Sequence, residues 1–211
     1  MGCGGGTLSL PLAPMVRSIT AVDFSSNMLD IVRRRCKAKG IDNVKTVNCS
    51  WEDDWDDAGI GVHDIAIASR SLIGDDFDVL INKLSKAARR AVYISTMVGS
   101  GPFDKPLFES TGRTFNMGED YIFYYDLLYE MGIQANVAFC REDHRNVWAS
   151  HEEALDDQRW MFHGMTEVEE DRVRTYLEKN LKEENGRFAL PYNRDCYWAV
   201  MWWNKEMEDR L

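Results

Sequence analysis

A glycine-rich turn at the start of the chain restricts the fold more than any other feature of the sequence. Residues 2–6 read Gly-Cys-Gly-Gly-Gly, and an apolar run with helical character follows from Leu8 to Met15. Glycines at alternating positions allow a backbone to turn sharply and to approach a ligand without an intervening Cβ atom. The next apolar segment begins at Ser18 and ends in the acidic residue Asp23. A carboxylate at this distance after the turn is placed to accept hydrogen bonds from the hydroxyls of a bound ribose.

Strand and helix patterns then alternate through the first half of the chain. The run from His63 to Ser69 (HDIAIAS) is nearly all apolar, which predicts a strand buried on both faces of a parallel sheet. Repeated βα units of this kind imply an α/β fold with a doubly wound, mostly parallel sheet. The predicted strands and helices of this half are strands at 18–23, 44–47, 63–69 and 91–96, and helices at 25–39 and 75–89.

The pattern changes after the last of these strands. Residues 98–119 are rich in Gly, Pro, Ser and Thr, which predicts a long loop with little regular structure. We expect one domain over residues 1–211, in which the segments 98–119 and 150–182 act as caps over a substrate mouth. The later predicted elements are an aromatic helix at 120–131, strands at 135–141, 146–149 and 196–203, and helices at 152–162 and 167–181.

The order and spacing of the glycine turn, its helix and Asp23 resemble the S-adenosylmethionine (SAM) dependent methyltransferases of the seven-stranded Rossmann-like class. The resemblance covers nearly the whole chain at fold level and residues 2–55 at motif level. It implies a Rossmann-like methyltransferase fold with a helical insertion between the last two strands.

In that family an apolar strand from the middle of the sheet leads into the glycine turn, and here Met1 stands directly before it. We therefore expect Met1 to be an internal residue of a longer reading frame, the alternative being a family member that begins at this point. Without the upstream strand, the strands at 18–23 and 63–69 would face a gap. Apolar edges exposed there would favour self-association, including a homo-oligomer.

The resemblance implies which residues of the turn hold the cofactor. Gly2, Gly4 and Gly6 would pass under the methionine and ribose parts of SAM. Cys3 is interpreted as a small residue of the same loop and not as a nucleophile. Asp23 would bind the ribose hydroxyls.

A second group of residues is expected around the adenine. Phe24 or Met28 would supply an apolar contact, although an inward-facing core methionine is the alternative for Met28. Ser50, Trp51 and Glu52 follow the predicted strand at 44–47, where the family contacts the adenine ring and its amino group. Trp51 would stack on the ring and the Glu52 or Asp53 carboxylate would accept from the amino group, unless the segment is only a solvated acidic loop.

A third group is expected at the reacting end. Ser69 and Arg70 end the buried strand, where ligands of α/β sheets bind, so they should face the sulfonium. Arg70 would pair with the cofactor carboxylate or an acidic substrate, or else point to solvent. Tyr121 and Tyr125 of the aromatic helix would line the substrate pocket or pack in the core, and His144 would lie near the mouth. The sequence identifies no catalytic residue.

Composition restricts the partners. The net charge of −10 disfavours a nucleic-acid substrate, and no apolar run approaches the roughly 20 residues needed to span a bilayer. Five widely spaced cysteines without a C-x-x-C pair argue against disulfides and zinc and favour the cytoplasm. The histidines show no H-x-x-x-H spacing, so no metal is expected.

We predict a cytoplasmic, SAM-dependent methyltransferase that acts on a small molecule of neutral or cationic character. The alternatives are a protein methyltransferase with an open groove and a non-catalytic SAM-binding partner subunit. A NAD-dependent oxidoreductase ranks last, because the dinucleotide turn G-x-G-x-x-G would place glycine or alanine at position 7, which is threonine here.

Overall fold

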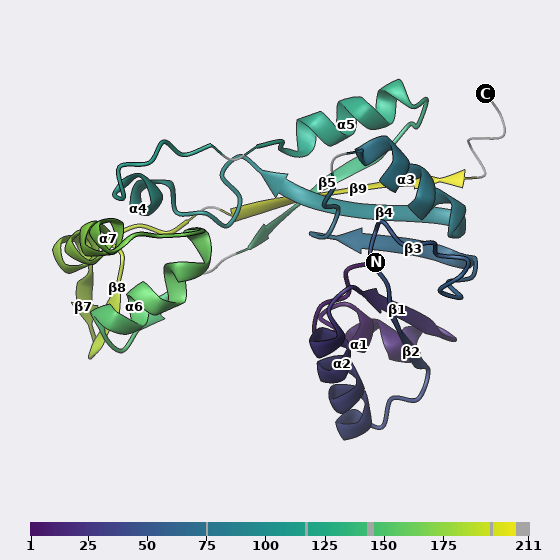
Figure 1. Cartoon of the computed structure of the whole chain (residues 1–211), viewed down its shortest axis with the longest axis horizontal. Helices are drawn as coiled ribbons and strands as arrows, with labels where there is room; N and C mark the ends of the chain where they lie inside the picture. The colour runs from purple at the N-terminus through teal and green to yellow at the C-terminus, as the bar shows by residue number, and fades with distance from the viewer. Residues whose placement is uncertain (75, 117, 143–145, 195, 206–211) are drawn as a thin grey trace. The chain divides into compact units, whose positions relative to one another are not determined.

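The structure is a computed structural model, and it describes residues 1–74, 76–116, 118–142, 146–194 and 196–205 (Figure 1). The chain divides into two compact units. Unit 1 consists of Met1–Thr96, Ile122–Ala138 and Ala199–Leu211, and unit 2 consists of Met97–Tyr121 and Phe139–Trp198. Each unit is described separately below.

The first part of unit 1 is a βαβ arrangement next to the glycine turn. β1 and β2 pair in parallel, with Asp23 opposite Asn48 at their carboxyl ends. The Ser25 hydroxyl accepts a hydrogen bond from the Met28 amide and caps α2, while Gly40 ends this helix in a left-handed conformation (φ +65°). The elements are α1 (Ser9–Leu12), η1 (Ala13–Met15), β1 (Ile19–Asp23), α2 (Ser26–Lys39) and β2 (Val44–Asn48).

The second part of unit 1 belongs to a four-stranded sheet with the order β3-β4-β9-β5. β3 and β4 are parallel, and β9 runs opposite to β4 (Figure 1). Phe77 of α3 packs edge-to-face against Phe123 and Tyr124 of α5. The elements are β3 (His63–Ser69), α3 (Phe77–Lys86), β4 (Ala88–Val98), α5 (Tyr121–Glu130), β5 (Asn136–Glu142) and β9 (Cys196–Asn204).

The gap predicted between the strands at 18–23 and 63–69 is present. In the described residues β1 is hydrogen-bonded to β2 and β3 to β4, and no ladder joins β1 to β3. The prediction that β3 is buried on both faces is therefore wrong. Ile65, in the middle of this strand, is 48% exposed because it borders a cavity between β1 and β3.

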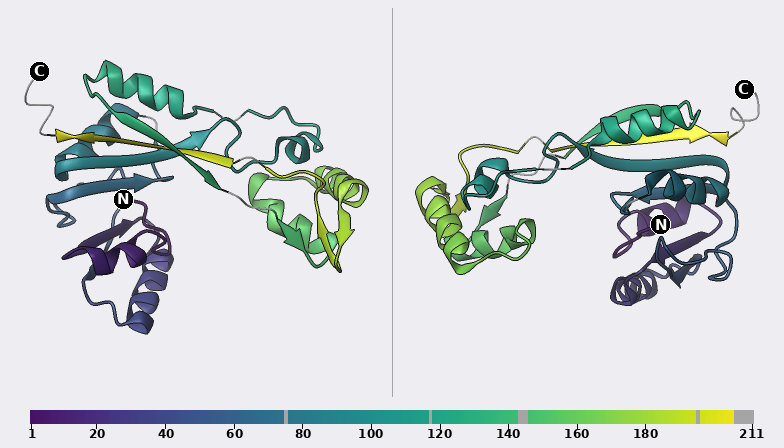
Figure 2. Two further views of the ribbon diagram at one scale, coloured as in Figure 1. Left: turned by 180° about the vertical axis from the view of Figure 1, so that it is seen from behind. Right: turned by 45° about the horizontal axis from the view of Figure 1, so that its top comes forward.

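Unit 2 contains helices and a small antiparallel sheet with the order β6-β8-β7. Asn185 and Gly186 join β7 to β8 with φ of +52° and +74°, the left-handed pair that a two-residue hairpin turn requires. α6 and α7 lie beside this hairpin in each view (Figures 1 and 2). The elements are α4 (Lys105–Glu109), β6 (Val147–Trp148), α6 (His151–Gln158), η2 (Arg159–Met161), α7 (Glu167–Asn180), β7 (Lys182–Glu184) and β8 (Arg187–Ala189).

The segment 98–119 carries more structure than a loop, because α4 lies within it. Asp104 is 1% exposed, and its carboxylate accepts hydrogen bonds from the Leu107 amide (3.0 Å) and from the Tyr192 hydroxyl (3.1 and 3.2 Å). The Tyr192 hydroxyl also meets that of Tyr176 on α7, at 3.0 Å. Burial and the neighbouring hydroxyl and carboxylate raise the pKa of Tyr192, so that its hydroxyl stays protonated and able to donate. Asp104 thus links α4 to the rest of unit 2.

Replacing this carboxylate should destabilise unit 2. Asp104→Ala leaves the Leu107 amide and the Tyr192 hydroxyl without their acceptor, at an expected cost of about 1–3 kcal/mol in the free energy of unfolding. Hydrogen exchange in α4 and urea unfolding measure this cost. The control is Glu109→Ala at the end of the same helix, where only an exposed ion pair with Lys105 is lost. Equal stability of the two variants would contradict the role of Asp104.

Candidate functional site

The glycine turn is fixed to the end of β1 by one carboxylate. Asp23, which is 5% exposed, accepts hydrogen bonds from the Gly4 amide at Oδ2 (2.7 Å) and from the Ser25 amide at Oδ1 (2.9 Å). The Cys3 amide donates to the Val22 carbonyl at 2.9 Å. Because an ionised carboxylate has about four lone-pair sites, Asp23 keeps capacity for further donors.

The turn has the conformation that only glycine adopts without strain. Gly2, Gly4 and Gly6 have φ of +66°, +50° and +85°. A Cβ at Gly6 would lie 2.2 Å from the side chain of Leu10, so helix α1 packs directly on this glycine. A Cβ at Gly4 would meet nothing within 4 Å, so the backbone here borders open space that a ligand can approach.

Cys3 has the properties of a small loop residue. Burial and the charge of Asp23 raise the pKa of Cys3 to about 11, and the thiol is therefore protonated at neutral pH. A protonated thiol is a poor nucleophile.

The end of β3 lies next to the glycine turn. The Ser69 hydroxyl meets the Ser95 hydroxyl at 2.8 Å, and the Ser71 hydroxyl donates to the Met1 carbonyl at 2.8 Å. Arg70 has φ of +56°, a left-handed conformation that costs energy in a residue other than glycine. Its amide donates to the Ser95 carbonyl at 2.9 Å, so the turn after β3 is held by β4.

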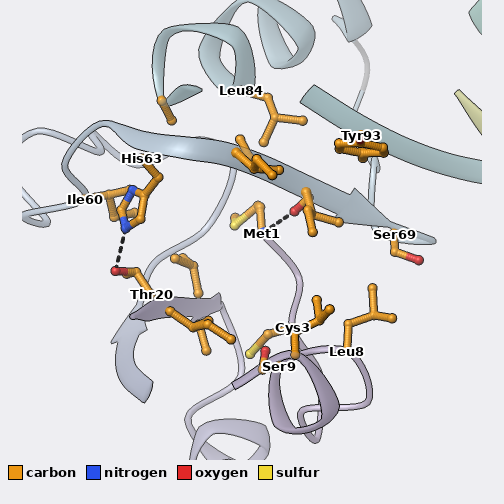
Figure 3. A pocket seen from close by; sticks show the side chains of 18 of the residues that line it. Met1, Cys3, Leu8, Ser9, Thr20, Ile60, His63, Ser69, Leu84 and Tyr93 are labelled. Atoms are coloured by element: carbon orange, nitrogen blue, oxygen red, sulfur yellow. Dashed lines mark hydrogen bonds between the residues drawn. The ribbon is translucent and has the colours of Figure 1, made fainter. Parts of the chain in front are cut away.

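A cavity of about 810 Å³ extends between β1 and β3 (Figure 3). Its wall includes the turn residues Gly2, Cys3 and Gly4 together with Ser69 and Arg70. The rest of the wall is formed by β1 and β3 along their lengths and by residues of α1, α3, β4 and the segments next to them. Most of the lining residues therefore lie away from the turn, and only the end of the cavity near Ser69 coincides with the predicted cofactor site.

Comparison with known proteins assigns the family. The sequence profile of a family described as "Methyltransferase domain" matches residues 1–91. An uncharacterized protein of Haemophilus influenzae is 30% identical over 205 residues, which are 97% of this chain and 74% of that protein. Residues 1–91 therefore form a methyltransferase domain of the class I SAM-dependent type.

Solved structures show the same Rossmann-like fold. A proposed methyltransferase from Bacillus halodurans matches with a TM-score of 0.63 at 13% identity, covering 97% of this chain and 90% of that one. Magnesium protoporphyrin IX methyltransferase from Synechocystis, solved with bound SAH, matches with a TM-score of 0.50 at 20% identity, covering 68% of this chain and 66% of that one. These likenesses establish the fold of this methyltransferase and leave its acceptor open.

The acidic segment after β2 is more ordered than a solvated loop. The Trp51 indole donates a hydrogen bond to the Ser71 carbonyl at 2.7 Å. It also packs on the Trp55 ring, with 5.3 Å between the two ring centroids. Trp51 is only 7% exposed, so adenine stacking on this ring would require those contacts to open. Hydrogen bonds from the Ser50 hydroxyl and from its own amide lower the pKa of the exposed Glu52 carboxyl, which is therefore ionised and able to accept from an amino group.

Two residues that support this edge were missed by the sequence analysis. Lys83 of α3 donates to the Trp51 carbonyl at 2.7 Å and to the Asp53 carbonyl, and its ammonium lies 5.2 Å from the Trp55 ring centre. Asn48, the last residue of β2, donates its side-chain amide to the carbonyls of Asp23 and Phe24, at 3.0 and 2.8 Å. Neither contact has a sequence signal, because both join segments that are distant along the chain.

The remaining predicted residues are distributed over the two units. Phe24 is 76% and Met28 is 41% exposed beside Asp23, so both are accessible to a ligand. Tyr121 belongs to unit 2 and packs edge-to-face on Phe139, whereas Tyr125 belongs to unit 1 and is exposed on α5. His144 lies outside the described residues. The assignment of these side chains to a cofactor or substrate stays a prediction.

The described part of the chain holds neither a candidate metal site nor a candidate membrane-spanning helix. No group of three or more His, Cys, Asp or Glu side chains there is placed to hold a metal ion. None of the helices there is both long enough and apolar enough to cross a bilayer.

We expect Lys83 to hold the segment after β2 in place. Lys83→Met removes the donor to two carbonyls, a loss of about 1–2 kcal/mol that makes hydrogen exchange in residues 50–57 roughly tenfold faster. Lys86→Met is the matched control, since Lys86 is exposed in the last turn of the same helix. The assignment fails if the two variants exchange at the same rate in this segment.

Proposed function

We propose that this methyltransferase transfers a methyl group from SAM to a small-molecule acceptor. The main support for this proposal is the arrangement of Asp23 and the glycine turn at the carboxyl end of β1. The Gly4 amide is bound to the carboxylate at 2.7 Å, while the opposite side of Gly4 faces open space. A ribose that binds Asp23 would therefore lie against a backbone free of Cβ atoms.

The chain offers contacts for each part of the cofactor. Gly2, Gly4 and Gly6, with Cys3 between them, would lie under the methionine and ribose parts, and Asp23 would bind the ribose hydroxyls. SAM supplies the electrophilic methyl group when it is bound. The protein then has to orient the cofactor and acceptor in line and exclude water.

The adenine and sulfonium ends are assigned to neighbouring residues. The exposed Phe24 and Met28 would provide the apolar contact for the adenine ring. The backbone of Ser50 and Trp51 and the ionised Glu52 carboxylate would meet its polar edge, with Trp51 stacking only after its present contacts open. Ser69 would face the sulfonium.

The acceptor is proposed to be a small molecule of neutral or cationic character. The net charge of −10 disfavours polyanions, and aromatic faces attract cations. Arg70, Tyr121, Tyr125 and His144 are the proposed substrate contacts. The segments 98–119 and 150–182, both within unit 2, are proposed to cap the substrate.

Removal of the Asp23 charge should weaken cofactor binding. Asp23→Asn loses charge-assisted hydrogen bonds to the ribose, an expected cost of about 1–3 kcal/mol, which is roughly ten- to hundredfold in the Kd for SAM or SAH. Isothermal titration calorimetry measures the Kd, and circular dichroism checks the fold of the variant. Asp30→Asn is the control, because Asp30 is an exposed residue of α2 paired with Arg33.

A second variant tests the open side of the glycine turn. Gly4→Ala places a methyl group in the open space beside the turn and is expected to reduce SAM binding. Because Gly4 has φ of +50°, the substitution also costs about 1–2 kcal/mol of backbone strain, which thermal unfolding of the variant measures separately. If NADH binds and SAM gives no heat, the cofactor assignment is wrong.

Incubation of the protein with methyl-tritiated SAM and cell extract tests the acceptor. Label in a protein and in no metabolite would contradict the small-molecule proposal. SAM binding without any transfer of the label would indicate a non-catalytic subunit.

A further inference from the structure

The turn that follows β3 has a strained backbone. Arg70, in the middle of this turn, has φ of +56°, which costs energy in a residue other than glycine. Its amide donates to the Ser95 carbonyl of β4 at 2.9 Å, and the Ser69 hydroxyl meets the Ser95 hydroxyl at 2.8 Å. Such a conformation persists only where the surrounding structure fixes it. β4 fixes one side of the turn, and Ser71 supplies contacts on the other side.

Ser71 bonds to two segments that are distant from it along the chain. Its hydroxyl donates to the Met1 carbonyl at 2.8 Å, and its carbonyl accepts from the Trp51 indole at 2.7 Å. Its side chain also packs on the glycine turn, since a Cβ on Gly2 would lie 2.2 Å from the Ser71 Cβ. Ser71 thus joins the glycine turn to the segment after β2.

The Trp51 end of this connection is itself fixed. Trp51 is buried, and its carbonyl accepts from the Lys83 ammonium at 2.7 Å. Its ring packs on that of Trp55, whose indole donates to the Ser50 carbonyl at 3.0 Å. These contacts give the Ser71 carbonyl a donor in a defined position. A displacement of Ser71 would therefore shift the glycine turn relative to the segment after β2.

We propose that Ser71 is a positioning residue for the cofactor, because it fixes the spacing between the glycine turn and the segment 50–52. Under the proposed function, on which this assignment rests, the turn holds the methionine and ribose parts of SAM and the segment holds the adenine. Ser71 acts through Gly2 and Trp51, and not by contact with SAM. Small errors in the placement of binding groups are costly in reactions that depend on in-line geometry.

Loss of the Ser71 hydroxyl should weaken SAH binding. Ser71→Ala removes the donor to the Met1 carbonyl and keeps the backbone carbonyl that accepts from Trp51. We expect the Kd for SAH, measured by isothermal titration calorimetry, to rise roughly three- to tenfold. Ser85→Ala is the control, because the buried Ser85 hydroxyl has no hydrogen-bond partner in the described part of the chain.

The calorimetry distinguishes two failures. If the unsubstituted protein binds SAH and Ser71→Ala binds it equally well, the assignment of Ser71 is wrong and the proposed function stands. If the unsubstituted protein does not bind SAH, the proposed function is wrong and the assignment falls with it.

A pair of tryptophan variants tests whether the effect passes through Ser71. Trp51→Phe removes the indole N–H that meets the Ser71 carbonyl and keeps an aromatic ring. It should make hydrogen exchange in residues 2–6 several times faster, although Trp51 has no bond to these residues among those described. Trp55→Phe is the control, since it removes the donor to the Ser50 carbonyl in the same segment and leaves the Ser71 carbonyl bonded. Equal exchange in residues 2–6 of the two variants would contradict the assignment.

The double variant distinguishes one shared connection from two independent stabilising contacts. If Ser71→Ala and Trp51→Phe break the same connection, the combined variant should raise the Kd for SAH by clearly less than the product of the two single fold-changes. Thermal unfolding without SAH checks that each variant is folded. A rise equal to that product would overturn the assignment, because the two side chains would then act separately.

Discussion

The Asp23 carboxylate is the interaction on which the arrangement of unit 1 depends most. It accepts from the Gly4 amide of the turn and from the Ser25 amide at the start of α2. One side chain therefore fixes three segments, namely the turn, the end of β1 and the entry into the helix. Charge-assisted hydrogen bonds are stronger than neutral ones, so this carboxylate organises its surroundings even without a ligand. The same residue is the proposed ribose ligand, which couples the geometry of the site to that of the fold.

The edge of the candidate site is held by contacts from neighbouring βα units. Asn48 bonds the carbonyls at the end of β1, and Lys83 of α3 bonds those of the segment after β2. The glycine turn also borders the cavity between β1 and β3.

Local chemistry explains which parts of the structure the sequence could predict. Ser25 and Gly40 bound α2 by capping and by a left-handed turn, both of which depend on residues next to the helix. The Asn185-Gly186 hairpin carries an equally local signal that was overlooked. Lys83 and the exposure of Ile65 could not be predicted, because they depend on which segments meet across the sheet. The cofactor residues were predicted from a family pattern, and the structure shows their positions without a ligand to test them.

The most direct test of the SAM assignment is a crystal structure of the protein, extended by any residues encoded in frame before Met1, in complex with SAH. The account predicts that both ribose hydroxyls lie within hydrogen-bond distance of the Asp23 carboxylate, with the homocysteine part passing over Gly4. A ligand bound elsewhere, with Asp23 still bonded only to Gly4 and Ser25, would contradict it and leave Asp23 as a residue that only stabilises the turn.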